Sequence, residues 1–158
     1  MEHYVEVFQR NAGDTSASGD YLLLPGWGAI EWRKLIATTT PRPFKASEII
    51  IQRGVDDQML YFVAAGALEV GVTYVDGISI SPLAKIGAGS VAGEQSFFDG
   101  QPRSANVWAT ADGELLCLSR DRYHDLAKEE PALVRELIFA LGRILSLRLR
   151  NTSLRVRR

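Results

Sequence analysis

Short runs of β-branched and aromatic residues fill the middle of the chain, and glycines or Asp-Gly pairs separate them. The runs are SEIIIQRG, MLYFVAAGALEVGVTYV, ISISPLAKIG, SANVWATA and ELLCLS. Asp76-Gly77, which lies between two of these runs, is typical of a tight β-hairpin. Short strands at regular spacing with turn residues between them predict an antiparallel β-sandwich or barrel.

Helical patterns flank the predicted strands on both sides. Residues 27–40 predict a short helix that ends before Pro41, and RDRYHDLAKEE predicts a second one after the last strand. From Ala132 onward apolar residues recur every three or four positions, as on one face of a longer helix. That apolar stripe needs a partner, which is either the barrel or a second copy of the helix.

Residues 11–20, NAGDTSASGD, are small and polar, as in a linker or mobile arm. We therefore expect an N-terminal arm and linker over 1–26, one domain over 27–150 and a basic tail over 151–158. The architecture predicted for the domain is a helix, an antiparallel barrel and two C-terminal helices.

The composition fits a soluble globular chain, with 46% hydrophobic and 23% charged residues. No run approaches the eighteen apolar residues of a membrane span, and MEHYVEVFQR does not resemble a signal peptide. Cys117 is the only cysteine, which excludes a disulfide framework and a thiolate metal site. We expect it to be a buried free thiol in a strand of a cytoplasmic protein.

Charge is unevenly distributed along the chain, whose net charge is −1. The segment after residue 130 holds seven arginines and one glutamate, so it carries +6 and the rest carries −7. A basic C-terminal helix is compatible with nucleic acid or membrane contact. It equally fits a solvated helix whose arginines lie near the negative end of the helix dipole, and we expect neither nucleic acid nor membrane as a partner.

The loop GEQSFFDGQPRSA, residues 93–105, is the candidate binding element. Gly93 and Pro102 restrict the backbone at its two ends, so that backbone N–H groups can converge on an anion. Arg103 offers a fork of donors suited to phosphate oxygens, and Glu94 offers acceptors for a hydroxyl. The loop therefore predicts a ligand that carries both phosphate and hydroxyl groups. The alternative is that Glu94 and Arg103 simply pair with each other at the surface.

The stretch SVAGEQSFFDGQPRSANVWA resembles the phosphate-binding cassette of the cyclic nucleotide-binding domain family. That family includes bacterial catabolite activators, protein kinase A regulatory subunits and gated channels. FKASEIIIQRG and MLYFVAAGALEV are similar to its early barrel strands, and the resemblance covers roughly Trp32 to Leu149. It implies an eight-stranded jelly-roll barrel flanked by helices, with a cyclic nucleotide bound inside.

The resemblance also implies a role for each matched residue. Glu94 would bind the ribose 2′-hydroxyl, and Arg103 would bind the cyclic phosphate. The backbone N–H groups of Ser104 and Ala105 would lie beside the phosphate, and Gly93 would let the backbone approach the sugar. The residues expected at the base are Val70, Leu83, Ile86 and Val91 of the barrel, with Arg143 and Arg148 on the final helix. That helix, Ala132 to Arg150, would act as a lid over the base.

Two positions of the cassette affect what can be inferred about the ligand. Position 95 is usually aliphatic in the family and is Gln95 here. Members with Thr after the Arg tend to accept cGMP, whereas Ser104 is shorter, so we expect cAMP to be preferred. Members that have lost the Arg bind nothing, but Arg103 is present.

The resemblance implies a non-enzymatic regulatory domain that senses a cyclic nucleotide, and other functions compete with it. A metal-dependent enzyme on a jelly-roll needs clustered ligands, and the only histidines are His3 and His124, so we expect no catalysis and no metal. The sequence ends at Arg158 without room for a helix-turn-helix, so we expect a stand-alone bacterial-type member that acts on a separate effector protein. A homodimer through the final helix, a barrel that only docks proteins, and a pocket for another phosphorylated ligand such as a cyclic dinucleotide all remain open.

Overall fold

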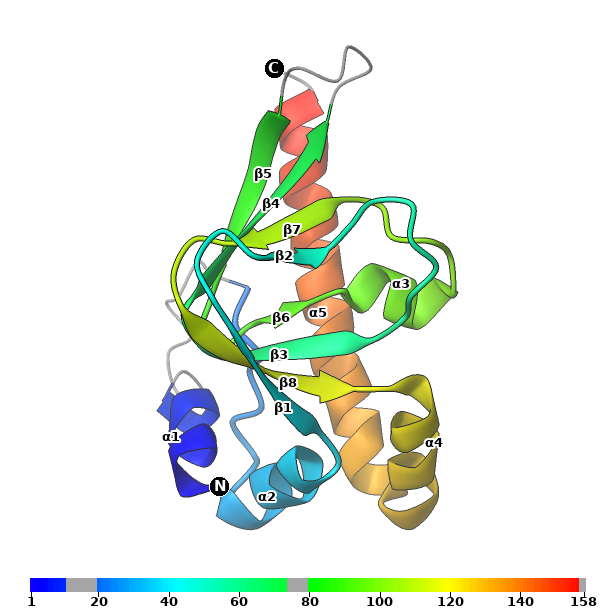
Figure 1. Ribbon diagram of the computed structural model, residues 1–158. Coiled ribbons are helices and arrows are strands. Elements are labelled where there is room, and N and C mark those ends of the chain that lie inside the picture. Colours follow the sequence, from blue (N-terminus) through cyan, green and yellow to red (C-terminus); the bar gives the residue numbers. More distant parts are fainter. Residues whose placement is uncertain (11–19, 74–79, 157–158) are drawn as a thin grey trace.

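The structure is a computed structural model, which describes the backbone of residues 1–10, 20–73 and 80–156 and the side chains of 1–10, 20–71 and 84–151. Figure 1 shows its helices and strands. The helices are α1 (Glu2–Arg10), α2 (Ala29–Ala37), α3 (Glu94–Asp99), α4 (Arg120–Glu129) and α5 (Pro131–Val156). The strands are β1 (Thr40–Phe44), β2 (Ile49–Ile51), β3 (Leu60–Ala65), β4 (Ala67–Thr73), β5 (Ile80–Gly87), β6 (Val91–Ala92), β7 (Asn106–Ala109) and β8 (Gly113–Leu118).

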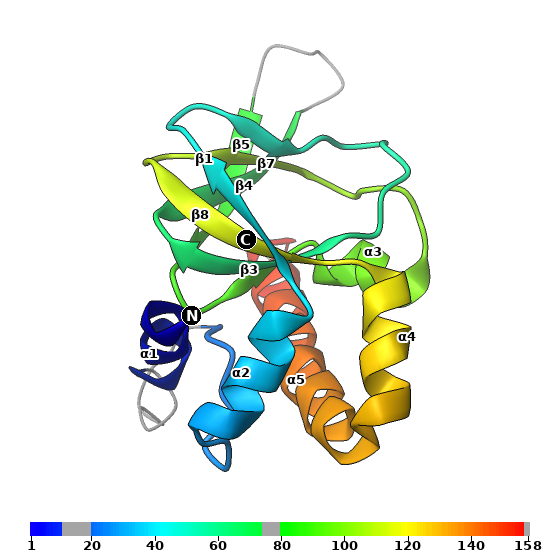
Figure 2. The ribbon, with the colours of Figure 1, turned by 60° about the horizontal axis from the view of Figure 1, so that its bottom comes forward.

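The described strands form two four-stranded antiparallel sheets, ordered β1-β8-β3-β6 and β2-β7-β4-β5. No ladder of hydrogen bonds among these strands joins the sheets into a closed barrel. Figure 2 shows helices α2, α4 and α5 gathered on one side of the sheets. The predicted fold class, a jelly-roll of antiparallel strands with flanking helices, is confirmed. The Asp76-Gly77 hairpin lies outside the described residues.

Strand β3 separates the two parts of the hydrophobic core, because its side chains alternate between the faces of its sheet. Phe62 points into the larger cluster, which the helices cover, and Val63 points into the smaller cluster between the sheets. Both residues are almost completely buried. The smaller cluster supports the apolar wall of the cavity described below.

Strand β1, with the sequence TPRPF, was not expected. It pairs with β8 on one side and lies at the end of its sheet. Proline cannot donate a backbone hydrogen bond and is tolerated on edge strands, so Pro41 and Pro43 fit this position. The helix before it ends at Ala37, as predicted.

Helix α1 packs against the domain through Val5 and Phe8, which are both buried. The ring of Phe8 stacks on Trp32 at 5.4 Å between centroids and meets Phe62 edge-on at 6.1 Å. The polar segment 11–20 indicated a linker, and its residues 11–19 lie outside the described chain. An aromatic cluster thus attaches the first ten residues to the core.

Residues 20–27, which we call the strap, pass beside α5 on the way to α2. The backbone N–H of Leu22 donates to the Gly89 carbonyl at 2.9 Å, and the side chain of Leu22 is fully buried. The indole Nε1 of Trp27 donates to Glu136 of α5 at 2.6 Å. The strap is therefore held between the barrel and the last helix.

Helix α5 buries the predicted apolar stripe against the domain rather than leaving it open. Its buried residues are Leu133, Val134, Leu137, Ala140, Leu141 and Ile144. Phe139 lies on another face and is 83% exposed. None of the described helices combines the length and apolar character needed to cross a membrane.

Candidate functional site

A cavity of about 210 Å³ lies where the barrel, α3, the strap and α5 meet. Its apolar lining consists of Ile51, Val70, Ala84, Ile86, Ala92 and Val107. Its remaining lining consists of Asp20, Gly93, Glu94, Gln95, Ser96, Arg103, Ser104, Ala105, Arg148 and Asn151. An apolar wall beside a small set of charged and polar groups is typical of a site for a small ligand.

Arg103 lines this cavity and is only 4% exposed. Its Nη1 donates to the Gly93 carbonyl at 3.0 Å, and its Nη2 donates to the Met59 carbonyl at 2.6 Å and to Asp57 at 2.9 Å. The Nε group is buried and has no hydrogen-bond partner among the described residues. The guanidinium has five N–H donors and makes these three hydrogen bonds, so it can still donate to a further acceptor, such as a ligand oxygen.

The backbone around Arg103 is fixed by the turn that follows β2. The Arg103 N–H donates to the Val55 carbonyl at 2.9 Å, and the Gly54 N–H donates to the Arg103 carbonyl at 2.8 Å. These two bonds hold the end of the cassette against a distant part of the chain. The backbone position of Arg103 is therefore fixed by the protein alone.

Gly93 has a φ of +83°, in the left-handed region that favours glycine. A Cβ there would lie 2.7 Å from Arg103 Nη1 and 2.8 Å from the Met59 carbonyl oxygen. The same residue starts α3 and accepts a bond from Arg103, so the glycine is required by both backbone conformation and close packing.

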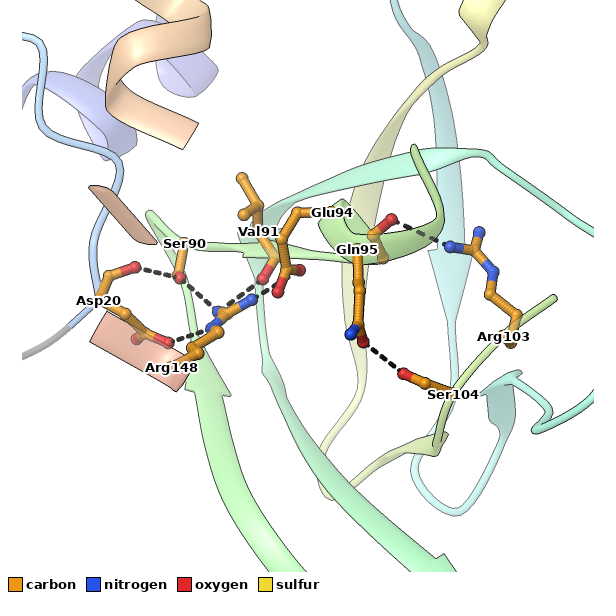
Figure 3. Close-up of polar contacts among 9 residues, drawn as sticks. Asp20, Ser90, Val91, Glu94, Gln95, Arg103, Ser104 and Arg148 are labelled. Carbon is orange, nitrogen blue, oxygen red and sulfur yellow. Dashed lines mark hydrogen bonds and ion pairs between the residues drawn. The ribbon is translucent and has the colours of Figure 1, made fainter. Parts of the chain in front are cut away.

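Glu94 is 8% exposed and contacts Arg148 of α5, not Arg103. Its Oε2 lies 2.7 Å from Arg148 Nη1 (Figure 3). Burial opposes the charged form of Arg148, but the carboxylates of Glu94 and Asp20 outweigh it and raise the pKa of Arg148 above its usual value. The surface pair between Glu94 and Arg103, which the sequence left open, is not formed.

The side chain of Gln95, near the start of the cassette, contacts Ser104, near its end. The Ser104 hydroxyl donates to Gln95 Oε1 at 2.5 Å (Figure 3). The unusual polar residue at position 95 therefore forms a bond within the cassette, and this bond engages the hydroxyl that follows Arg103.

Most of the expected binding residues line this one cavity: Gly93, Glu94, Arg103, Ser104, Ala105, Val70, Ile86 and Arg148. Val91 instead is fully buried in the core, and its carbonyl accepts a bond from Arg148 at 2.8 Å. Arg143 lies beside the strap, where it donates to the Tyr21 carbonyl at 3.4 Å. The side chain of Leu83 lies outside the described residues.

Sequence reasoning missed three polar residues of the site. Asp57 and Asp20 contact arginines that are 46 and 128 positions away along the chain, and Asn151 lines the cavity from α5. No local motif marks any of them. Only a pairing expected for each buried arginine could have suggested that such carboxylates exist.

The described residues contain no cluster of three or more metal-binding side chains. His3 lies on α1 and His124 on α4, and neither lines the cavity. Cys117 is a free thiol in β8, as predicted, although it is only partly buried, and that burial raises the pKa of the thiol.

The fold and the cavity together define a jelly-roll domain with a cavity between its barrel and its last helix, lined by apolar, acidic and basic side chains. The family described as "Cyclic nucleotide-binding domain" matches residues 41–130, more than half of the chain, and the chain belongs to that family. Its cassette, from Gly93 to Ala105, lies within the matched region.

The chain is similar to the "Cyclic AMP receptor protein" of Thermus thermophilus, with 34% identity over 72% of this chain and 50% of that protein. The crystal structure of the Thermus thermophilus catabolite activator protein superposes with a TM-score of 0.73 and 30% identity over 83% of this chain and 59% of that one. A cyclic nucleotide-binding domain from Methylobacillus flagellatus gives a TM-score of 0.80 and 25% identity over 97% of this chain and 82% of that one. The chain spans about half the length of the curated relative.

Proposed function

We propose that the cavity binds a cyclic nucleotide, with cAMP preferred over cGMP, and that the domain is a non-enzymatic regulatory sensor. The observation that carries this proposal is the pair of nearly buried charges, Arg103 and Glu94, at one cavity with an apolar wall. Burying charged groups is costly, so their presence at a cavity favours a role in ligand binding.

Arg103 is proposed to bind the cyclic phosphate. Its Nε donor is unsatisfied, while its other two nitrogens are held by the protein. The backbone N–H groups of Ser104 and Ala105, which line the same cavity, would add donors to the phosphate oxygens. A phosphate oxygen that reached Nε would give this buried donor a partner.

Glu94 is proposed to accept a hydrogen bond from a ribose hydroxyl. A carboxylate has two oxygens and about four lone-pair sites, so the contact of Arg148 with Oε2 leaves acceptor capacity for a ligand. Val70 and Ile86 would lie against the base. The bond of Ser104 to Gln95 supports adenine over guanine, because reading the guanine amino group needs a hydroxyl that can turn toward the base.

Helix α5 is proposed to transmit the signal. Arg148 and Asn151 of this helix line the cavity, so a ligand that contacts them would favour one position of α5 over another. A ligand shifts such an equilibrium only through contacts that differ between the two positions. The proposed output is a change at α5 that is recognised by an effector protein, and the exposed face of α5 is proposed to pair with a second copy of the chain.

The test is isothermal titration of cAMP and of cGMP into the nucleotide-stripped domain and its Arg103→Ala variant. We expect micromolar or tighter binding of cAMP, weaker binding of cGMP, and a loss in the variant of roughly thirty- to several-thousand-fold. Arg42→Ala is the matched control, because Arg42 pairs with Glu48 outside the cavity and its loss should leave the affinity unchanged.

Circular dichroism must show that Arg103→Ala is folded, and Arg103→Lys, which keeps the charge but not the donor fork, should also bind less tightly. A wild-type domain that gives no heat with either nucleotide would contradict the proposal. A titration with a cyclic dinucleotide would then separate another phosphorylated ligand from a purely protein-docking role.

A further inference from the structure

We propose that Asp20 of the strap is a positioning residue of the binding cavity, acting through Arg148 on Glu94. This inference rests on the proposed function of the cavity, and it assigns a part of ligand binding to a segment outside the barrel. The strap would then belong to the sensor itself and not to a passive linker before it.

Arg148 is the meeting point of three parts of the chain. Its Nε donates to Asp20 Oδ2 at 2.5 Å, and its Nη1 lies 2.7 Å from Glu94 Oε2 (Figure 3). Its Nη2 donates to the Val91 carbonyl at 2.8 Å and to the Ser90 hydroxyl at 3.2 Å. One guanidinium thus connects the strap, α5 and the residue proposed to bind the sugar.

The strap is also connected to Arg148 through Ser90. The Ser90 hydroxyl donates to the backbone carbonyl of Asp20 at 2.5 Å while it accepts from Arg148. Asp20 is therefore held by both its backbone and its carboxylate, so its position relative to Arg148 is fixed. A residue that is held twice can orient its partner better than a freely moving side chain.

These contacts are more buried than four other ion pairs of the described chain, and the pair of Arg103 with Asp57 also has a buried arginine. The side chains of Arg148, Asp20 and Glu94 are 17%, 24% and 10% exposed, whereas both partners are at least 36% exposed in the pairs of Arg33, Lys34, Arg42 and Lys45. Exposed pairs contribute little, but removing one member of a buried group leaves its partner uncompensated. Loss of the Asp20 carboxylate should therefore shift the side chain of Arg148 and, through Arg148, that of Glu94.

A purely structural role for Asp20, as a clamp between strap and helix, makes a different prediction. The strap has another polar contact with α5, the bond from Trp27 to Glu136, and neither of these residues lines the cavity. If any loosening of the strap lowers the affinity for the ligand, removing the Trp27–Glu136 bond should lower it as much as removing Asp20 does. If Asp20 acts through Arg148, removing the Trp27–Glu136 bond should leave the affinity unchanged.

The experiment measures cAMP affinity by titration for wild type, Asp20→Asn, Arg148→Gln and the double variant. We expect Asp20→Asn to weaken binding roughly tenfold, a typical size for coupling between two sites. In the Arg148→Gln background the same change should have an effect below about twofold, because the route to Glu94 is already broken. Glu136→Ala, which removes the acceptor of the Trp27 bond, is the matched control and should keep the wild-type affinity.

A second measurement uses hydrogen exchange of the strap amides with and without cAMP. Since coupling between sites is reciprocal, cAMP should slow exchange at Leu22 in wild type but not in Asp20→Asn. The exchange rate at Leu22 measures the coupling at the strap directly, independently of the affinities measured by titration.

The outcomes separate the two ideas. Wild-type binding with an unchanged affinity in Asp20→Asn would overturn the positioning role and leave the proposed function intact. Equal losses in Asp20→Asn and Glu136→Ala, or an undiminished effect of Asp20→Asn in the Arg148→Gln background, would overturn it in favour of a general clamp. A wild-type domain that binds neither cAMP nor cGMP would overturn the proposed function, and the positioning role with it.

Discussion

At Gly93 the backbone conformation and the proposed ligand contact of Arg103 depend on each other. A methyl group at this position would collide with both Arg103 and the Met59 carbonyl. We predict that Gly93→Ala weakens cAMP binding at least tenfold, because Arg103 must move out of place, and costs about 1–3 kcal/mol of stability. Titration and urea unfolding measure the two effects.

Gly54 provides the control for this substitution. Its φ of +86° matches that of Gly93, but a Cβ there would have nothing within 4 Å. Gly54→Ala should therefore show a similar backbone strain but a smaller loss of affinity than Gly93→Ala, because Gly54 bonds to the backbone of Arg103 and does not contact its guanidinium. If both variants bind cAMP equally well, the close contact with Arg103 does not matter for the site.

The residues of the cassette were predictable because they form one continuous motif with its own backbone signals. Glu94 and Arg103 were expected at the cavity, and the structure places both there. Their partners, Asp57 and Arg148, were not predictable as partners because only the folded chain brings them close. A motif identifies the groups that meet a ligand, whereas the groups that hold them depend on tertiary packing.

Helix α1 shows how an element can be missed when its signal is short. Its nine residues are fewer than an isolated helix needs in water, so packing stabilises it more than propensity does. The strands, in contrast, were recognised from their β-branched runs and Gly turns. Strand β1 was not predicted because its two prolines indicated a break between elements, although proline is tolerated on an edge strand.

The contribution of α1 to the domain can be measured at Phe8, which is 1% exposed between Trp32 and Phe62. We predict that Phe8→Ala lowers the free energy of unfolding by about 3–5 kcal/mol, because it opens a cavity in the aromatic cluster. Ile30→Ala, at a side chain that is 64% exposed, should change it by less than about 0.5 kcal/mol. Equal effects in urea unfolding would show that α1 is not part of the cooperative core.

At the scale of the whole molecule, one face of α5 carries Phe139 and Leu149 at the surface, with Gly142 and Ser146 between them. Small residues between exposed apolar ones let a second helix approach closely. We predict that the domain sediments as a dimer and that Phe139→Glu converts it to a monomer, because the substitution places a charge in the apolar contact.

Ile49→Glu is the control for the dimer, since Ile49 is also an exposed large apolar residue, at 62%, but lies on β2. It should leave the sedimentation coefficient unchanged. A wild-type domain that sediments only as a monomer at all concentrations would refute pairing through α5.

The bond between Trp27 and Glu136 gives the domain an optical reporter of its own. The chain has three tryptophans, and among the described residues only the indole N–H of Trp27 donates to a carboxylate, that of Glu136 in α5, at 2.6 Å. Separation of the strap from the helix would replace that carboxylate by water and change the emission of this one ring. Tryptophan fluorescence, compared with that of a Trp27→Phe variant, can therefore follow the relative movement of the two segments without any attached dye.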